Sequence, residues 1–496
     1  MPITADTIQY GPWDGGVRYD RPVEDLAPSE MGDMQNVRIG SAGEARRRNG
    51  SASYQSAAAI ASTPTVTMAA EFKPNSSTTY VVIVCGAAIY KYSSGWSAIT
   101  GAVTVTAGDD NTFEWVNANG TLVATNGVDT DAWKWTGTGD ATVLDDDARF
   151  TKGKHIAWFD QRLWIGNVNG ATNQLWYSDT LDIETWGATS FYNFGGEILA
   201  LVPAQNALVV HTTDGIYTLI PTGNATVPYQ RQVRTQQGAA DGRSTVALPG
   251  DIELFVRPDG IYRWEGGAEI VKISTQLDGD YWPSLNSARF SKTFAVYYPK
   301  NNEVWFALPY GAAQSAMNHV MVYNTTYDRW HGPYTGWTRA CGALIDGKPH
   351  LGDLDGILWD SDTGNNDGVS AIDAWFTTAA PAPYGGSVRT RWLYARNYFD
   401  GQGDYSVTVT QDAGGLVGTT RSLSIRGNSF TLGTDYLGIG VLGSIRMLFR
   451  DTDLTGYDPH SSLKYSMNAL NQTFTFRHVH LQHRPTGRVR KPAETE

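Results

Sequence analysis

A short unit recurs along most of this chain, and it constrains the fold more than any other feature. Each copy holds an apolar strand, a turn rich in Gly, Asp or Asn, and a short strand that combines an aliphatic residue with an aromatic ring. Successive copies are 44, 42, 41, 45, 43 and 53 residues apart, counted between the equivalent positions Ile89, Trp133, Leu175, Ile216, Ile261, Val304 and Ile357. A strand-only repeat of this length predicts a β-propeller of six or seven blades.

The composition supports an all-β fold. The chain has 496 residues, including 17 Trp, 25 Tyr, 16 Phe and 53 Gly. Rings suit the half-buried faces of strands, and Gly suits tight turns. We expect rings to fill the spaces between blades, and Asp-Gly or Asn-rich turns to supply the positive-φ positions of tight hairpins. The competing interpretation is an irregular stack of β-sandwiches.

The pattern divides the chain into three regions. Residues 1–58 predict an extended N-terminal arm with strands and a short helix from Pro28 through Met34, because Pro is favoured at the first helical position. Residues 59–375 predict the propeller. In residues 376–496 the repeat is lost, and the alternation of Tyr or Val with Ser or Thr in Tyr405 to Thr410 predicts a C-terminal β-sandwich that ends in a basic tail.

Charge and cysteine content narrow the class of protein. The formal net charge is −12 at pH 7, so the chain as a whole offers no basic face for gripping nucleic acid. The two cysteines, Cys85 and Cys341, predict buried thiols and no disulfide framework. The first 30 residues lack a signal-peptide pattern and no run of 18 apolar residues occurs. We therefore expect a soluble product of a reducing cytoplasm, without membrane insertion.

Two stretches contain residue types that bind metal ions elsewhere. Asp360 to Asp367 places carboxylates at alternate positions before a Gly turn, as a calcium loop does, but lacks the Glu expected at the twelfth position. His478 and His480 share one face of a strand and His483 follows, but no carboxylate or thiol joins them locally. An exposed loop and a solvated or interface strand are the favoured interpretations, so we predict no metal or cofactor ligands.

Catalytic motifs are scarce. The sequence has neither a Gly-x-Ser-x-Gly elbow nor a phosphate-binding Gly-x4-Gly-Lys-Ser/Thr loop. Ser178 to Trp186 is similar to the Asp-box of sialidase propellers, which is a structural turn, and Asp145 to Asp147 predict a solvated turn. We therefore predict no catalytic residues and no enzymatic activity. The alternative is a propeller glycosidase or carbohydrate-binding protein, whose site would converge on the central channel from scattered positions.

The arm and the propeller region resemble one family of virion proteins. They are similar to the tail nozzle (tubular protein B-like) of short-tailed phages and to the related hub or packaged-DNA stabilisation proteins. The resemblance is diffuse and has no single diagnostic motif. It rests on Gly11 to Val17, Pro22, Leu26 to Glu30, Asn36 to Arg38, Arg46 to Gly50, Arg162 to Gly166, Leu175 to Trp186, and Val322 to Trp330.

The resemblance implies a structural protein of a virion tail, made in the host cytoplasm. Such a subunit forms a ring, here expected to be a homohexamer, below the portal and adaptor rings. The ring would form the DNA exit channel and would support tail fibres or spikes. The resemblance leaves open whether the chain is a nozzle or a hub.

Charge and chain pattern indicate which surfaces such a ring would use. Genomic DNA would pass without sequence-specific binding along an acidic or neutral channel lined by loops such as Asp145 to Asp147. Arg46 to Arg48 and the basic stretch from Arg477 to Lys491 would face acidic protein neighbours. The arm, held extended by Gly15-Gly16 and Pro22, would find strand partners in neighbouring subunits.

Overall fold

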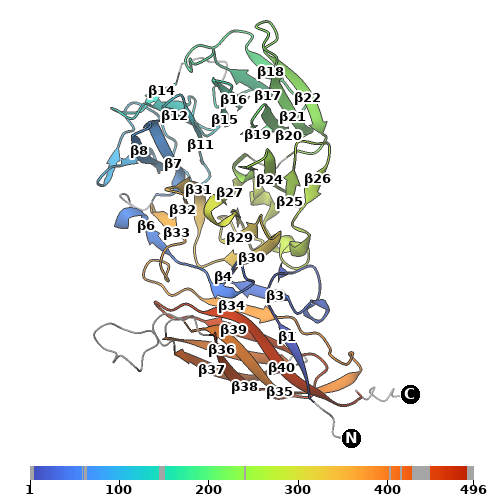
Figure 1. The fold of residues 1–496 in the computed structure, drawn as a ribbon. Helices are drawn as coiled ribbons and strands as arrows, with labels where there is room; N and C mark the ends of the chain where they lie inside the picture. The colour runs from blue at the N-terminus through green and yellow to red at the C-terminus, as the bar shows by residue number, and fades with distance from the viewer. Residues whose placement is uncertain are drawn as a thin grey trace.

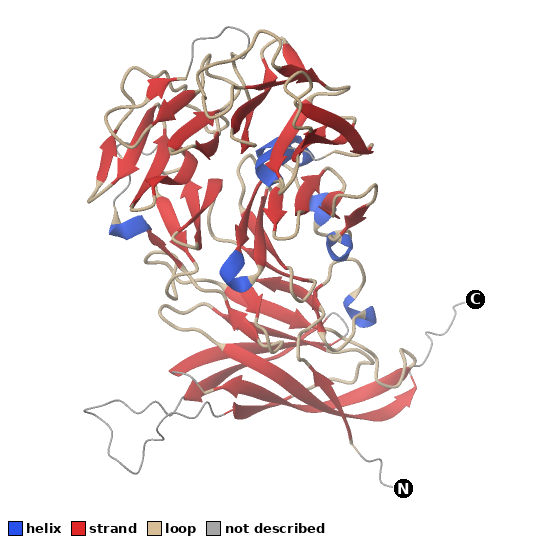
Figure 2. Cartoon of the chain, turned by 45° about the horizontal axis from the view of Figure 1, so that its top comes forward, coloured by secondary structure: helices blue, strands red, loops and turns tan. Residues whose placement is uncertain are grey.

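A computed structural model describes residues 5–57, 60, 64–144, 151–238, 242–401, 404–413, 416–426 and 447–488. The all-β class is confirmed, because strands make up nearly all the regular structure of these residues (Figure 2). The described helices are short 3-10 turns: η1 (Val23–Asp25), η2 (Tyr54–Ser56), η4 (Gly242–Ser244), η5 (Thr275–Leu277), η6 (Trp282–Ser284), η7 (Ser287–Lys292) and η8 (Pro299–Asn301).

Four-stranded antiparallel sheets form the larger part of the molecule, and seven of them occur among the described residues. Sheets 1 to 3 contain β7 (Val66–Asn75), β8 (Thr78–Cys85), β9 (Ala88–Tyr92) and β10 (Trp96–Ala98); β11 (Glu114–Ala118), β12 (Thr121–Thr125), β13 (Trp133–Trp135) and β14 (Thr142–Val143); and β15 (His155–Phe159), β16 (Arg162–Val168), β17 (Ala171–Tyr177) and β18 (Phe191–Asn193). Sheets 4 and 5 contain β19 (Ile198–Pro203), β20 (Leu208–Thr212), β21 (Gly215–Pro221) and β22 (Tyr229–Thr235); and β23 (Val246–Leu248), β24 (Ile252–Arg257), β25 (Gly260–Trp264) and β26 (Ile270–Lys272). Sheets 6 and 7 contain β27 (Phe294–Tyr298), β28 (Glu303–Leu308), β29 (His319–Asn324) and β30 (Arg329–Tyr334); and β31 (Arg339–Ile345), β32 (Lys348–Asp353), β33 (Leu358–Ser361) and β6 (Ser51–Ser53).

These sheets surround a common centre, as in a β-propeller (Figure 1). The first strand of each sheet contacts the first strands of the sheets before and after it, and β31 contacts β7, so the first strands close into a cycle. Rings fill the spaces between neighbouring sheets, as the composition predicts. Trp135 of sheet 2 lies 5.4 Å from Phe72 of sheet 1, and Trp164 of sheet 3 lies 4.9 Å from Tyr229 of sheet 4, measured between ring centroids.

The sequence repeat corresponds to single sheets. Hairpin turns with positive φ connect the strands, as at Asn119-Gly120 between β11 and β12, where φ is 49° and 78°. The sixth repeat also forms one four-stranded sheet. Its marker residue Val304 lies on the second strand, whereas the markers of sheets 1 to 5 lie on the third strand. This shift explains why the spacing that follows Val304 is longer than the others.

A pair of six-stranded sheets, which we call the base, lies below the propeller-like body (Figure 1). Inner faces of the two sheets meet through aromatic rings: Tyr465 and Phe476 have centroids 4.4 Å apart, and Phe376 lies 5.5 Å from Phe476. One sheet contains β38 (Met447–Asp453), β35 (Val388–Asp400), β40 (Thr475–Arg488), β5 (Ala45–Arg47) and β4 (Val37–Ile39), with β1 (Asp6–Tyr10) also paired to β40. The other contains β2 (Gly16–Val17), β3 (Glu30–Gln35), β34 (Ala374–Thr378), β39 (Ser462–Met467), β36 (Asp404–Ala413) and β37 (Leu416–Arg426).

The N-terminal segment differs from the predicted arm. Its strands β1 to β5 lie within the two base sheets, and β6 forms the outer strand of sheet 7. The expected helix from Pro28 through Met34 is wrong, because Glu30–Gln35 is a strand that pairs antiparallel with β34. Tertiary pairing and the burial of Met31 and Met34 outweigh the local helix-start signal of Pro28. The backbone groups expected to seek neighbouring subunits therefore find partners within the same chain.

Candidate functional site: axial cavity and propeller–base junction

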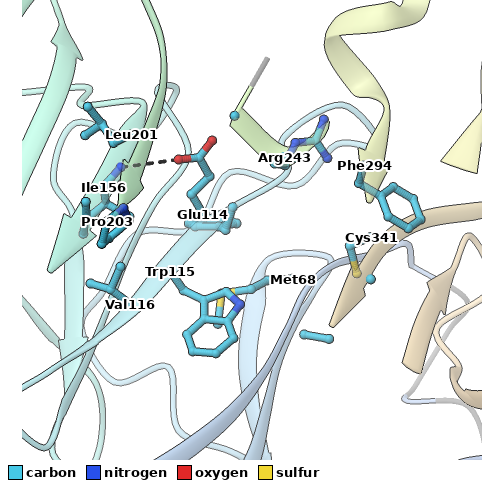
Figure 3. A pocket seen from close by; sticks show the side chains of 15 residues that line it. Met68, Glu114, Trp115, Val116, Ile156, Leu201, Pro203, Arg243, Phe294 and Cys341 are labelled. Carbon is cyan, nitrogen blue, oxygen red and sulfur yellow. Dashed lines mark hydrogen bonds between the residues drawn. The ribbon is translucent and has the colours of Figure 1, made fainter. Parts of the chain in front are cut away.

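A cavity of about 280 Å³ lies where the first strands of the sheets converge. Each of the seven sheets contributes to it, either from its first strand or, for sheet 5, from η4 just before that strand. Apolar side chains form much of the wall, and Figure 3 shows them around the cavity. They include Met68, Trp115, Ile156, Leu201, Phe294 and Cys341. Small-molecule sites measure about 300–1,000 Å³, so this cavity is slightly smaller than the usual range.

The charged groups of the axial cavity are bound by their neighbours. Glu114 accepts a hydrogen bond from the backbone N–H of Ile156 at 3.4 Å (Figure 3). Its Oε1 lies 2.9 Å from Nδ1 of the fully buried His155. Arg243 donates to the carbonyl of Ser291 at 3.1 Å. These contacts join adjacent sheets, so the charges hold the body together around its axis.

The junction between the body and the base contains a buried ion-pair network. Arg38 of β4 donates to both carboxylate oxygens of Glu303, at 2.8 and 2.5 Å, and to Asp362 at 2.9 Å. The side chains of Arg38 and Glu303 are only 4% and 3% exposed. Burial lowers the pKa of Arg38, but the charges of Glu303, Tyr334 and Asp362 and the hydrogen bond to Glu303 together outweigh burial and raise it. The guanidinium therefore stays charged and holds sheet 6 against the base.

His331 lies beside this network and stays neutral. Its Nε2 is 3.7 Å from Glu303, and the ring is fully buried. Burial, followed by the positive charge of Arg38, lowers the pKa of His331 well below its ordinary value. The network thus excludes a second positive charge at its centre.

The predicted outward role of Arg46 to Arg48 is wrong for two of the three residues. Arg48 donates to both oxygens of Asp367, at 3.0 and 2.6 Å, and Arg47 donates to the carbonyl of Ala469 at 2.8 Å. Both arginines are buried, whereas Arg46 is partly exposed. Arg47 and Arg48 therefore stabilise the junction within one chain, because their guanidinium groups already have partners there.

The Asp360 to Asp367 loop serves the same junction. Asp362 accepts hydrogen bonds from Arg38 and from the hydroxyl of Tyr298, the latter at 3.0 Å, and Asp367 pairs with Arg48. Two of the three carboxylates that resemble calcium ligands, Asp362 and Asp367, are thus partners of arginines, whereas Asp360 lies 3.7 Å from Lys348. Within the described residues, no group of three or more His, Cys, Asp and Glu side chains has the geometry to hold a metal ion.

The three histidines near the C-terminus do not form one cluster. His478 and His480 share a face of β40, with ring centroids 5.0 Å apart, and His478 stacks on Tyr398 at 4.3 Å. His483 is buried on the opposite side, against Trp392 at 5.5 Å. Burial lowers the pKa of both His478 and His483. His478 and His480 are partly exposed, so a solvated or interface strand stays a prediction for them, whereas the buried His483 does not fit that interpretation.

The other candidates occupy structural positions. In the Asp-box-like segment, Asp182 accepts from the backbone N–H of Glu184 at 2.9 Å, which closes a turn. Cys85 and Cys341 are buried free thiols, and burial raises their pKa to about 11 and about 12. Asp145 to Asp147 lie outside the described residues. None of the described helices has the length and apolar character needed to cross a membrane.

Sequence reasoning missed the junction itself. Arg38 stands between two aliphatic residues in a short strand, and an isolated charge among apolar neighbours is the one local signal that it is buried. Its partners Glu303 and Asp362 are more than 260 positions away, so no spacing pattern could connect them. Only the fold brings these three residues together.

No protein-family model matches the chain, and no curated protein matches it. Among solved structures, the chain is similar to the extracellular domain of a putative one-component system of B. thetaiotaomicron, with a TM-score of 0.45 and 9% identity over 83% of this chain and 64% of that one. It is also similar to PorZ, a surface component of the type-IX secretion system of Porphyromonas gingivalis, with a TM-score of 0.41 and 11% identity over 68% of this chain and 44% of that one. Hsv2 of Kluyveromyces lactis gives a TM-score of 0.36 and 10% identity over 64% of this chain and 94% of that one. The chain spans less than two thirds of the first two proteins, and such similarity assigns neither a family nor a function.

Proposed function

We propose that this chain is a structural subunit of a short phage tail, either a nozzle or a hub protein. Six copies would form a ring around a DNA exit channel, with a portal-adaptor ring on one side and tail fibres or spikes as further partners. The residue strings at the N-terminus and in the propeller-like body supply the resemblance on which this proposal rests. A structural subunit of this kind needs no catalytic residues.

One structural observation supports the proposal: the two halves of the molecule are locked to each other. The segment before residue 57 supplies strands to both base sheets and to sheet 7. Arg38 and Arg48 then bind carboxylates on the body side with bidentate geometry, which fixes orientation as well as distance. A part that transmits force in a ring benefits from a fixed angle between its domains, whereas a hinged protein would not.

The finer architecture belongs to the same proposal. The closed cycle of first strands supports seven blades, with β6 closing the last blade from the N-terminal side. The facing aromatic rings of the base support a two-sheet sandwich. With a cavity of only about 280 Å³ on the propeller axis, DNA would pass through the lumen between subunits and not through a propeller.

The net charge of the chain favours passage of DNA without tight binding to the subunit. The net charge of −12 gives the subunit an overall repulsion for phosphate at short range. Within the basic stretch that begins at Arg477, that residue already pairs with Asp400 at 2.8 Å. The chain would thus guide the duplex and would not hold it.

Negative-stain imaging of the purified full-length protein tests the proposal. The expected result is a six-fold ring with a central opening. A closed dimer or trimer would contradict the ring, and hydrolysis of a glycan by the purified chain would favour the glycosidase alternative. A subunit that docks only onto a preceding ring would remain monomeric in this experiment. Cross-linking of the chain inside assembled particles decides that case.

A further inference from the structure

Strands β38 and β1 lie at opposite edges of one base sheet. β40 pairs with β35 along one edge and with β1 along the other, and β38 pairs with the far edge of β35. Within the described residues, neither β1 nor β38 has a second strand partner. Each strand therefore presents a row of backbone N–H and C=O groups to its surroundings, and such rows pair with strands of other chains.

Several features that usually keep a sheet edge from pairing are missing from both strands. Asp6–Tyr10 and Met447–Asp453 contain no Lys and no Pro, and their ladders with β40 and β35 contain no bulge. On β38, the side chains of Met447 and Phe449 are 52% and 53% exposed. Large apolar side chains on an exposed edge favour contact with a further strand.

Each strand carries one charge on the face that points toward the other base sheet. Arg450 of β38 donates to the carbonyl of Ser424 in β37 at 3.0 Å, and to the carbonyl of the preceding residue at 3.0 Å. Asp6 of β1 lies opposite the buried His483 and accepts from the hydroxyl of Tyr384 at 2.7 Å. None of these hydrogen bonds joins opposite charges. A second β38 would add no opposite charge on this face, whereas β1 does.

We propose that β38 of one copy pairs with β1 of a second copy, the partner subunit, and thereby joins their base sheets. β38 and β1 run in opposite directions within one chain, so the new pairing is antiparallel like the existing ones. The contact joins two different edges of the same sheet, and such head-to-tail contacts generate a ring when the rotation closes. The contact rests on the proposed ring function and specifies which surfaces close the ring.

Side-chain direction and charge select one register for this pairing. Alternate residues of a strand point to opposite faces, so Arg450 must lie opposite a residue of β1 that also points toward the other base sheet. On that face of β1, Asp6 alone carries a charge, and opposite charges across two strands stabilise their pairing. The resulting register pairs Arg450 with Asp6 of the partner subunit, Leu448 with Ile8, and Phe449 with Thr7. Leu448 and Ile8 are half-buried, so their pairing also removes apolar surface from water.

Engineered cysteines in assembled virus particles test the contact. With Thr7→Cys and Phe449→Cys in one full-length chain, mild oxidation is expected to give a disulfide ladder that ends at six copies, because the Cβ atoms of opposed residues lie about 4.5–5.5 Å apart. Within one chain, three strand spacings of about 14 Å separate these two residues, which is too far for an internal disulfide. The control pair, Thr7→Cys with Asp453→Cys, is displaced by about 13 Å along β38 and should form no ladder.

The outcomes separate this contact from the proposed ring. A ladder from the control pair, and not from the test pair, would refute the register. Absence of both ladders, in particles whose parent chain cross-links chemically up to six copies, would refute the contact and leave the ring function standing. A parent chain that never reaches six copies would instead overturn the ring itself, and the contact with it.

Charge reversal supplies a second measurement if the cysteine variants fail to assemble. Arg450→Asp and Asp6→Arg are each expected to lower the amount of chain in particles at least about tenfold, the effect of losing one charge-assisted hydrogen bond. The combined variant should recover the level of the parent. The matched control is Arg421→Asp, at an exposed position of β37 in the other base sheet, and it should be incorporated like the parent. Equal incorporation of Arg450→Asp and the control, or no recovery in the combined variant, would overturn the assignment.

Discussion

The propeller-like body and the base are connected in opposite ways. Sheets 1 to 6 each consist of four strands that follow one another along the chain, so their pairings are hairpins. The base combines the first strands of the chain with the last, and Ile8 pairs with Leu481 across the whole sequence. Closing a long loop costs more entropy than closing a hairpin. Stabilising contacts must therefore compensate for the larger entropy cost of forming the base, and the body needs no such compensation.

The N-terminal segment supplies part of those contacts. Tyr10, Trp13 and Val17 are fully buried, and Trp13 lies 5.5 Å from Phe376 and 6.1 Å from Phe476 in the base core. The same segment carries Arg38 to the junction. Local order thus builds the body, whereas the base and its orientation depend on one segment that reaches both.

The largest expected effect follows from deletion of residues 1–25, which should destabilise the base and leave the propeller-like body folded. It removes β1 and β2 with three fully buried side chains, a loss comparable to the stability of a whole domain, about 5–15 kcal/mol. Hydrogen exchange should show that β35 and β40 lose protection while β8 and β28 keep it. Deletion of residues 1–5 alone is the control. Full protection of β40 after the longer deletion would show that the base is independent of this segment.

Arg38→Met tests the junction. The substitution leaves Glu303 buried and uncompensated, and we expect a loss of about 3–5 kcal/mol in the free energy of unfolding by urea. Arg289→Ala, which breaks the more exposed pair with Asp110, should cost about 0–1 kcal/mol. The double variant Arg38→Met with Glu303→Leu should recover most of the loss. A single-variant cost as small as that of the control would mean that the network does not hold the halves together.

The pH dependence of the free energy of unfolding tests one residue of the propeller-like body, His319. Burial lowers the pKa of His319 to about 4, from an ordinary value of 6.5, so the folded state favours the neutral ring. The contribution of His319 to stability is complete above pH 6.5 and is lost as the pH falls toward 4, by about 2–3 kcal/mol. His319→Gln should flatten urea-unfolding stability across this window relative to the parent. The other buried histidines keep their own slope in both proteins, and parallel curves would contradict the assignment.

The sequence predicted these two regions unequally for a physical reason. Regular spacing of Ile89, Trp133 and their equivalents indicated the propeller-like repeat, because each repeat is a local unit. The strand Glu30–Gln35 was missed because its partner β34 lies far along the chain. Asp362 and Asp367 resemble calcium ligands until Arg38 and Arg48 are placed beside them.

The smallest expected effect concerns the binding of duplex DNA. At about 0.15 M salt, we expect the full-length protein to bind duplex DNA no more tightly than non-specific binders do, with Kd values of about 10⁻⁴–10⁻⁶ M. Fluorescence anisotropy across a salt series measures this. Tight, salt-sensitive binding that disappears when Arg488, Arg490 and Lys491 are changed to Glu would make the basic tail a DNA-gripping element.

Cross-linking of the chain inside assembled virus particles tests the central claim most directly. A locked subunit of a tail ring should give a ladder of cross-linked species that ends at six copies, resolved by denaturing electrophoresis and mass spectrometry. Because the subunits are cross-linked where they function, the result does not depend on whether the free protein assembles. A ladder that ends at two or three copies, or particles that lack the chain altogether, would contradict the account.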